Sequence, residues 1–355
     1  MRARKTSAAV DGGHALAGRS GEGDAEDTTA AERLAFEDLA RERRNAIKVH
    51  CYRMLGSLAD AEDMTQETFA RAWRARGELV DRASARSWLY QIATNACLDA
   101  LRRRKRERRL WGDPAPAIAG ADLGAPDLDV DWLEPMPDSI LSGVVDDGPG
   151  PYASYAQAEA VRLAFLACVQ LLPARQRAIF LLQDVLGWSA AEVASAFAMS
   201  PQAANSLLQR ARRTFDAAYR DEPKWSAASD LDQKAAERYA AALESRDLDA
   251  FMALLRSGAT LHMPPWRAWF RGQSAIRAFV AKILQGYSGF RTRVFGANGQ
   301  SAIAVYVRMP GDDAWRPHAV HILEVSDGAV ASIVAFVGPL CLSLFSSTGP
   351  PLEPP

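Results

Sequence analysis

The segment that most constrains this chain is 60–106, where an acidic helix start leads through a loop into a second helix ending in a run of Arg and Lys. On the second helix, four polar side chains recur every three or four residues and share one face: Asn95, Asp99, Arg102 and Arg106. Such a face is suited to contact the bases and phosphates of a nucleic acid. A solvated surface helix carries the same charges, so the neighbouring segments must decide between the two interpretations.

The whole chain sets broad limits on its class. A length of 355 residues predicts two or three domains, and 48% hydrophobic residues are ample for buried cores. No apolar run is long enough to span a bilayer, and the N-terminus lacks the pattern of a secretion signal, so we expect a cytoplasmic protein with no membrane partner. The cysteines show no metal-binding or disulfide spacing, and we expect reduced thiols and no metal or cofactor: Cys51, Cys97, Cys168 and Cys341.

The near-zero net charge hides a strong asymmetry. Residues 31–110 hold 18 Lys and Arg against 12 Asp and Glu, whereas residues 111–152 hold 9 Asp and Glu and no Lys or Arg. A basic module followed by an acidic linker is typical of a nucleic-acid binder with a mobile tether that phosphates repel.

The pattern along the chain predicts a multidomain protein, with two all-α domains followed by an α+β domain. We expect a disordered tail over 1–30, a helical domain over 31–110, an acidic Pro/Gly-rich linker over 111–156, a second helical domain over 157–220, an α+β domain over 229–342 and a disordered tail over 343–355. Within the linker, the sequence WLEPMPD (132–138) is an apolar, proline-stiffened segment suited to dock on a surface.

The second helical domain contains a helix-turn-helix pattern. Ser189 and Glu192 form a capping box at the start of one helix, and Ser200 with Pro201 predict the start of the next. That second helix exposes amide, hydroxyl and cationic side chains: Gln202, Asn205, Ser206, Gln209, Arg210 and Arg213. Amides and Arg contact both base edges and phosphates, so the pattern favours DNA binding over an ordinary helical hairpin.

Taken together, these modules resemble a bacterial RNA polymerase sigma factor of the sigma-70 family, in the extracytoplasmic-function (ECF) group. HCYRMLGSLADAEDMTQETFARAW (50–73) is similar to the first helices of region 2, and ARSWLYQIATNACLDALRRRKR (85–106) to the part of region 2 that melts and reads the −10 element. The sequence LLPARQRAIFLLQDVLGWSAAEVASAFAMSPQAANSLLQRAR (171–212) resembles region 4, which reads the −35 element. The resemblance covers about half of the chain.

The resemblance implies two protein partners on core RNA polymerase, the β′ clamp and the β flap, and promoter DNA as the third partner. It assigns four residues to the clamp contact: Asp63, Gln66, Glu67 and Trp73. Carboxylates around an aromatic anchor suit a basic partner surface, although Trp73 fits a core position equally well.

For the −10 element, the resemblance implies base and phosphate contacts from Asn95, Asp99, Arg102 and Arg103, with the loop 77–86 capturing an extruded base. For the −35 element it assigns the exposed face listed above, with Arg212 as a further candidate. This chain departs from the usual ECF pattern near Asn205 and Leu207, where a Lys and an Arg are common. We therefore expect a flatter salt dependence of −35 binding.

The segment 230–280 resembles the opening of a SnoaL-like (NTF2-like) cone, in which helices pack on a curved antiparallel sheet around a pocket. Later segments fit the strands, with turns at 298–299, 310–311 and 327–328. The resemblance implies a regulatory domain that contacts the sigma core or the linker, whose WLEP motif (132–135) is typical of such proteins, and that replaces a separate anti-sigma factor. The candidate pocket residues are His262, Trp266, Trp269 and His318.

Two other functions remain open from the residues. Pockets of this fold host isomerases that use Asp or His as a base, but His318 and His321 are three apart on a strand and are expected to face opposite sides. No acid–base pair has persuasive spacing, so we expect no catalytic residue and no enzyme. The other alternative is a helix-turn-helix regulator that senses a ligand and acts without polymerase, which would have no use for a clamp-binding helix.

Overall fold

The computed structural model describes residues 20–78, 84–103, 108–109, 112, 115–141, 144, 159–219 and 230–338. The chain divides into two compact units, Met1–Glu42 and Arg43–Pro355. Among the described helices, none combines the length and the apolar character that a membrane span requires. Several sequence predictions lie outside these residues: the middle of the loop 77–86, Arg106, Cys341 and the tail 343–355.

Three helices form the first helical region: α1 (Ser20–Leu55), α2 (Leu58–Arg74) and α3 (Ala85–Arg103), with a 3-10 turn η1 (Arg76–Glu78) after α2. Ser57 caps α2 by accepting a hydrogen bond from the backbone N–H of Asp60 at 3.1 Å. In the core, His50 Nε2 lies 2.8 Å from Thr94 Oγ1, which links α1 to α3. Burial lowers the pKa of His50 to about 3, so this buried contact carries no charge at neutral pH.

Helix α1 begins at Ser20, within the segment 1–30 for which we expected a disordered tail. Residues 1–19 lie outside the described part of the chain.

The linker is docked over its described part, which contradicts the expectation of a mobile tether for 115–141. Strand β1 (Arg108–Arg109) pairs in parallel with β2 (Asp131–Trp132), and a short helix α4 (Asp138–Leu141) follows. Leu133 and Met136 are buried at 1% and 0% exposure, which confirms that WLEPMPD docks on a surface. Apolar burial and backbone pairing outweigh the polar composition that suggested mobility.

The second helical region contains α6 (Leu163–Gln170), α7 (Ala174–Phe180), the π-helical turn η2 (Leu181–Val185), α8 (Ala190–Ala196) and α9 (Pro201–Tyr219). The capping box of Ser189 and Glu192 is present, as predicted, and Ser200 Oγ accepts from the backbone N–H of Ala203 at 3.2 Å. Helix α9 packs its apolar side inward and leaves the other side exposed, so the helix-turn-helix prediction is confirmed.

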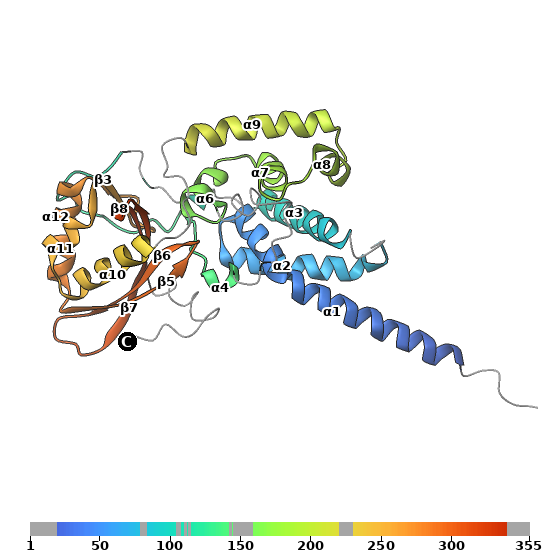
Figure 1. Ribbon diagram of the computed structural model, residues 1–355, viewed down its shortest axis with the longest axis horizontal. Coiled ribbons are helices and arrows are strands. Elements are labelled where there is room, and N and C mark those ends of the chain that lie inside the picture. The colour runs from blue at the N-terminus through green and yellow to red at the C-terminus, as the bar shows by residue number, and fades with distance from the viewer. Residues whose placement is uncertain are drawn as a thin grey trace, which may run out of the picture. The chain divides into compact units, whose positions relative to one another are not determined.

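The last domain packs α10 (Asp230–Glu244), α11 (Leu248–Ala253) and α12 (Gln273–Gly286) with a six-stranded sheet (Figure 1). The strands are β3 (Leu255–His262), β4 (Trp269–Arg271), β5 (Gly289–Ala297), β6 (Gln300–Arg308), β7 (Trp315–Ser326) and β8 (Ala329–Val337). Their order is β4-β3-β8-β7-β6-β5.

The sheet is mixed, whereas the resemblance implied an antiparallel one. The pair β3–β8 is parallel, and the other neighbouring pairs are antiparallel. Strands β3 and β8 are joined through β4, α12 and three further strands, so no tight hairpin forces them to run in opposite directions. The turn Asn298-Gly299 joins β5 to β6, with φ values of 56° and 64° that suit Asn and Gly.

Candidate functional site

The acidic face of α2 lines a surface groove of about 500 Å³. Three residues predicted to bind polymerase, Asp63, Gln66 and Glu67, lie together along it. Trp73 does not line this groove. Its ring is partly buried, with the guanidinium carbon of Arg76 4.2 Å from the ring centroid, so the aromatic residue is separated from the carboxylates.

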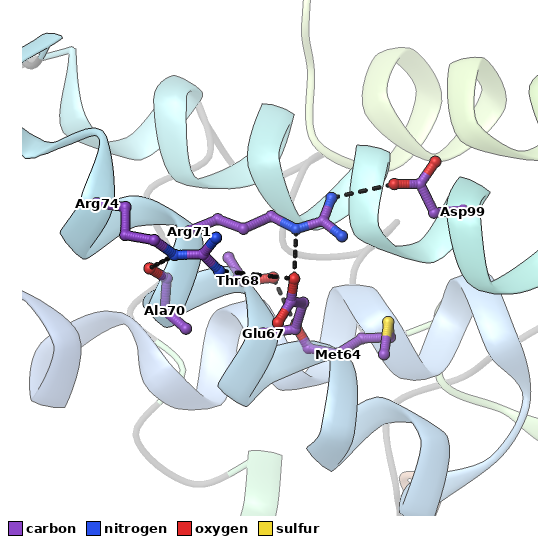
Figure 2. A network of polar contacts seen from close by, with 7 residues as sticks. All are labelled: Met64, Glu67, Thr68, Ala70, Arg71, Arg74 and Asp99. Atoms are coloured by element: carbon purple, nitrogen blue, oxygen red, sulfur yellow. Dashed lines mark hydrogen bonds and ion pairs between the residues drawn. The ribbon is translucent and has the colours of Figure 1, made fainter.

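Arg71 connects the acidic face of α2 to the polar face of α3, as Figure 2 shows. Its Nε donates to Glu67 Oε1 at 2.7 Å, and its Nη1 donates to Asp99 Oδ2 at 3.1 Å. The bond from Arg71 lowers the pKa of Glu67, which therefore stays negatively charged at neutral pH. Arg102 binds the other oxygen of Asp99 at 3.0 Å, so the Asp99 carboxylate orients two arginines.

The polar face of α3 is next to the second helical region. Asn95 and Arg102 line a cavity of about 450 Å³ together with residues from α7 and from the helix-turn-helix turn: Ala174, Arg175, Ala178, Ile179, Ala196, Phe197 and Met199. Gln91 on α3 donates a hydrogen bond to the carbonyl of Ala196 at 2.8 Å. Arg103 instead lines the groove of the acidic face, so the four predicted −10 residues are divided between two surfaces.

The exposed face of α9 carries all six residues predicted to read the −35 element: Gln202, Asn205, Ser206, Gln209, Arg210 and Arg213. Arg212 differs from them because its guanidinium binds the Asp184 carboxylate, with Nε to Oδ2 at 2.8 Å. Arg210 and Arg213 form no ion pair with any residue that the structure describes, so their charges face solvent.

Asn298, in the β5–β6 turn, joins the C-terminal domain to three other parts of the chain. Its Oδ1 accepts from the backbone N–H of Met136 at 2.8 Å, and its Nδ2 donates to Tyr52 Oη at 2.9 Å and to the carbonyl of Val161 at 2.8 Å. Asn298 is fully buried. We call this set of contacts the Asn298 junction. Sequence reasoning predicted the Asn-Gly turn but not these contacts, because turn chemistry says nothing about distant partners.

A buried ion pair lies close to the Asn298 junction. The Arg162 guanidinium binds both carboxylate oxygens of Glu324, and the two residues are 7% and 8% exposed. Gln300 Nε2 donates to Glu324 Oε2 at 2.9 Å, while its Oε1 accepts from the backbone N–H of Leu163 at 3.1 Å. The C-terminal domain therefore holds the start of the second helical region through charge-assisted bonds that solvent barely reaches.

The linker motif WLEP caps the first helical region. Glu134 Oε2 accepts from the backbone N–H of Leu58 at 2.8 Å and from Ser57 Oγ at 3.0 Å, at the start of α2. A carboxylate at a helix N-terminus satisfies unpaired N–H groups and interacts favourably with the helix dipole. The Tyr52 hydroxyl donates to the carbonyl of Glu134 at 2.6 Å, next to the Asn298 junction.

The C-terminal domain encloses a cavity of about 220 Å³ between its helices and the sheet. Trp266 and His318 line it, as predicted, but His262 and Trp269 do not. The rings of His262 and Trp269 stack with their centroids 4.8 Å apart. Neighbouring residues on a strand point to opposite faces of the sheet, and Leu261, next to His262 on β3, lines the cavity. His262 therefore points to the other face.

His318 and His321 both line the cavity, so the prediction that they face opposite sides is wrong. The register between β6 and β7 shifts at this point, because Val305 pairs with Ala319 while Tyr306 pairs with Pro317. His318 is the extra residue of this bulge, and a bulge breaks the alternation of side chains. Within the described residues, no three His, Cys, Asp or Glu side chains are grouped to hold a metal ion.

Comparison with protein families identifies three matching segments. The sigma-70 region 2 model matches residues 39–107, the sigma-70 region 4 model matches 162–215, and the SnoaL-like domain model matches 236–333. These matches coincide with the two helical regions and the α+β domain, which confirms the predicted fold class.

Similar proteins span most of the chain. The ECF RNA polymerase sigma factor SigG of Mycobacterium tuberculosis is 40% identical over 312 residues, which cover 87% of this chain and 82% of SigG. The ECF sigma factor SigJ of the same organism is 28% identical over 304 residues, covering 81% of this chain and 87% of SigJ. The crystal structure of SigJ has the same fold, with a TM-score of 0.57 at 24% identity, over 89% of this chain and 99% of that one.

Proposed function

The chain belongs to the ECF RNA polymerase sigma factors, and we propose that its C-terminal SnoaL-like domain holds regions 2 and 4 in a closed state that limits promoter binding. The family is not enzymatic, and its members direct core RNA polymerase to promoters. Region 2 comprises α1 to α3, and region 4 comprises α6 to α9. In the closed state, the polymerase-binding face of region 2 stays accessible, while region 4 lines a cavity with part of its −10 face.

The acidic groove on α2 supports the first half of this proposal. Asp63, Gln66 and Glu67 lie along one surface, where Arg71 donates to Glu67 and lowers its pKa. The carboxylates of Asp63 and Glu67, with Glu67 held in place by Arg71, are suited to pair with basic residues of a helical surface such as the β′ clamp, where complementary charge speeds association and sets register. Trp73 lies outside the groove, so it acts at the edge of this contact.

The cavity between α3 and region 4 supports the second half. Asn95 and Arg102, assigned to the −10 element, share that cavity with Phe197 and Met199 of the helix-turn-helix. Upstream −10 DNA and region 4 would therefore compete for one face of α3. Separation of α3 from region 4, including loss of the bond from Gln91 to Ala196, frees the face for DNA.

The Asn298 junction is the observation that carries the proposal. One buried side chain from the C-terminal domain bonds simultaneously to region 2 at Tyr52, to the linker at Met136 and to the start of region 4 at Val161. Because each buried hydrogen bond contributes about 1 kcal/mol, the junction supplies roughly 3 kcal/mol toward holding the three parts together.

Run-off transcription with purified core polymerase tests the proposal. We expect Asn298→Gly, which keeps the left-handed backbone available and removes the side chain, to increase transcript yield severalfold relative to the unchanged protein. The matched control is Asp327→Gly in the β7–β8 turn, where φ is 54° and the side chain is 90% exposed. The control is expected to leave transcription unchanged.

Two outcomes separate the parts of the proposal. If neither the unchanged protein nor any variant yields a promoter-dependent transcript, the chain does not recruit polymerase to a promoter, and that part of the proposal is refuted. Equal transcript from Asn298→Gly, Asp327→Gly and the unchanged protein would refute control by the C-terminal domain, while leaving recruitment of polymerase in place.

A further inference from the structure

The cavity of the SnoaL-like domain has an uncharged lining. None of its lining side chains is a carboxylate, an ammonium or a guanidinium group. Its wall is mostly aliphatic and aromatic, and the polar groups come from Tyr239, Tyr287, His318, His321 and Trp266. Burial lowers the pKa of His321 to about 3 and also lowers that of His318, so both rings are neutral at pH 7.

One polar pair lies inside this apolar wall. The Tyr239 hydroxyl is 2.9 Å from His321 Nδ1, and Tyr239 is 1% exposed. A neutral imidazole paired with a phenol offers hydrogen bonds to an uncharged hydroxyl or carbonyl group. An ionised group would lose its hydration here without gaining a counter-charge, which costs several kcal/mol or more.

Leu123 lines the cavity although it belongs to the linker and not to the domain. The linker around it is tied to the domain by backbone bonds on both sides: Ala117 N–H to Trp269 O at 2.7 Å, and Asp127 N–H to Pro265 O at 2.8 Å. The Trp266 indole N–H donates to the carbonyl of Gly124 at 3.0 Å, and Lys282 donates to that of Gly120 at 3.0 Å.

Gly112 marks another close approach of the linker to the domain. A Cβ at this position would overlap the backbone carbonyl of Arg267, so only glycine fits there without movement. The linker is therefore built to lie against the domain beside the cavity, with Leu123 inserted.

We propose that this cavity binds an uncharged, mainly apolar small molecule whose single hydroxyl or carbonyl group bonds to the Tyr239–His321 pair, and that the molecule displaces Leu123. The cavity, at about 220 Å³, is smaller than the roughly 300–1,000 Å³ usual for ligand sites. Removal of Leu123 enlarges it. Binding and docking of the linker are therefore mutually exclusive at this position, which couples the cavity to residues 115–127.

The effect on transcription rests on the proposed control by the C-terminal domain, whereas the binding itself does not. The test accordingly measures binding to the full-length chain. The probe is 2-naphthol, which is fluorescent, uncharged at pH 7 and carries one hydroxyl group. The comparison probe is 2-naphthoate, which has the same rings and a negative charge.

We expect saturable binding of 2-naphthol at one site and no measurable binding of 2-naphthoate. Leu123→Ala should tighten 2-naphthol binding about threefold to tenfold, because a smaller side chain competes less for the cavity. The matched control is Ile118→Ala, in the same linker segment, whose side chain is 80% exposed and should not affect binding. Tyr239→Phe keeps the ring and should weaken binding about fivefold to tenfold through loss of the hydroxyl.

Hydrogen exchange supplies a second readout. Saturation with 2-naphthol should speed exchange of the Ala117 and Asp127 amides, since both are bonded to the domain only while the linker is docked. Absence of 2-naphthol binding, equal binding of 2-naphthoate, or equal affinity of Leu123→Ala and the unchanged protein would each overturn the inference. Binding without any change in transcription supports the site and counts against control by the domain, so the two proposals fail separately.

Discussion

At the scale of single residues, side chains from distant segments meet where no local pattern predicts it. Asp138 at the start of α4 is an example, because its Oδ1 accepts from the backbone N–H of Gly299 at 2.8 Å, next to the Asn298 junction. A Cβ at Gly296 would overlap the Asp138 carboxylate, so this close approach also depends on glycine. Burial raises the pKa of Asp138 to about 6, against an ordinary value of 3.8.

The raised pKa makes this contact depend on pH. Asp138 binds a proton more tightly in the folded state than in the unfolded state. The stability that protonated Asp138 contributes is therefore complete below about pH 4 and is lost as the pH rises through 6. We expect Asp138→Asn, which keeps the acceptor oxygen and has no charge, to remove this loss. Between pH 5 and pH 7.5 the unchanged protein should lose about 1 kcal/mol of unfolding free energy relative to the variant, measured by urea denaturation.

Asp127→Asn is the matched control. Hydrogen bonding from Arg267 lowers the pKa of Asp127, so this carboxylate is ionised throughout the same pH window in both folded and unfolded states. Asp127→Asn should therefore leave the pH dependence of the unfolding free energy unchanged. Equal pH dependence in Asp138→Asn and the unchanged protein would show that Asp138 does not titrate across this range.

At the scale of single elements, the sequence predicted α8 and α9 well because their signals are local. The capping box at Ser189, the start at Pro201 and the apolar spacing that ends at Phe215 all act within a few residues. What the sequence could not assign is which arginine of α9 is free. Arg212 is bound to Asp184, 28 residues earlier in the chain, and only the packing of α9 on α7, which leads into η2, brings the two together.

This difference predicts how the arginines of α9 respond to salt. A phosphate contact adds about one to the slope of log affinity against log salt, so Arg213→Gln should lower the slope of −35 binding by about one. Arg212→Gln is the control and should change it less, because Asp184 already neutralises Arg212. The measurement is holoenzyme binding to a promoter fragment over a salt series. Equal slopes for both variants would contradict the assignment.

At the scale of the whole molecule, function depends on contacts between parts that are each recognisable alone. The polar face of α3 and the turn of the helix-turn-helix are both suited to DNA, yet they line one cavity. Glu134, Asn298 and the Arg162–Glu324 pair hold the surrounding parts through buried or capped polar groups. Polar contacts of this kind dissociate without exposing a large apolar core, which suits a state that has to open.

A reversible crosslink tests whether opening is required. With Cys introduced by Gln91→Cys and Ala196→Cys, a disulfide-containing bismaleimide should lock α3 to α8, since Gln91 bonds to the Ala196 carbonyl. Cys51, Cys97 and Cys168 are buried and compete little for the reagent, and Cys341, which lies outside the described residues, is replaced by Ser in every variant. We expect the locked protein to lose most promoter-dependent transcription and to recover it when a reductant cleaves the disulfide of the bismaleimide crosslinker.

Each single-cysteine variant, treated in the same way, serves as the control. Full activity of the locked protein would mean that promoter DNA and the contact between α3 and α8 coexist, and would refute the closed state as a barrier to transcription.

The sequence by itself determined the helices, the strands and the helix-turn-helix, because caps, turns and apolar periodicity act over short distances. The family followed from the resemblance of its motifs to those of known sigma factors. It also identified WLEPMPD as a segment that docks. Only the tertiary structure decided where that segment docks, that His318 and His321 share a cavity, and that Asn298 joins three parts of the chain. Those facts depend on a strand bulge and on contacts between residues far apart in the chain, such as the 162 residues between Met136 and Asn298, which no local pattern encodes.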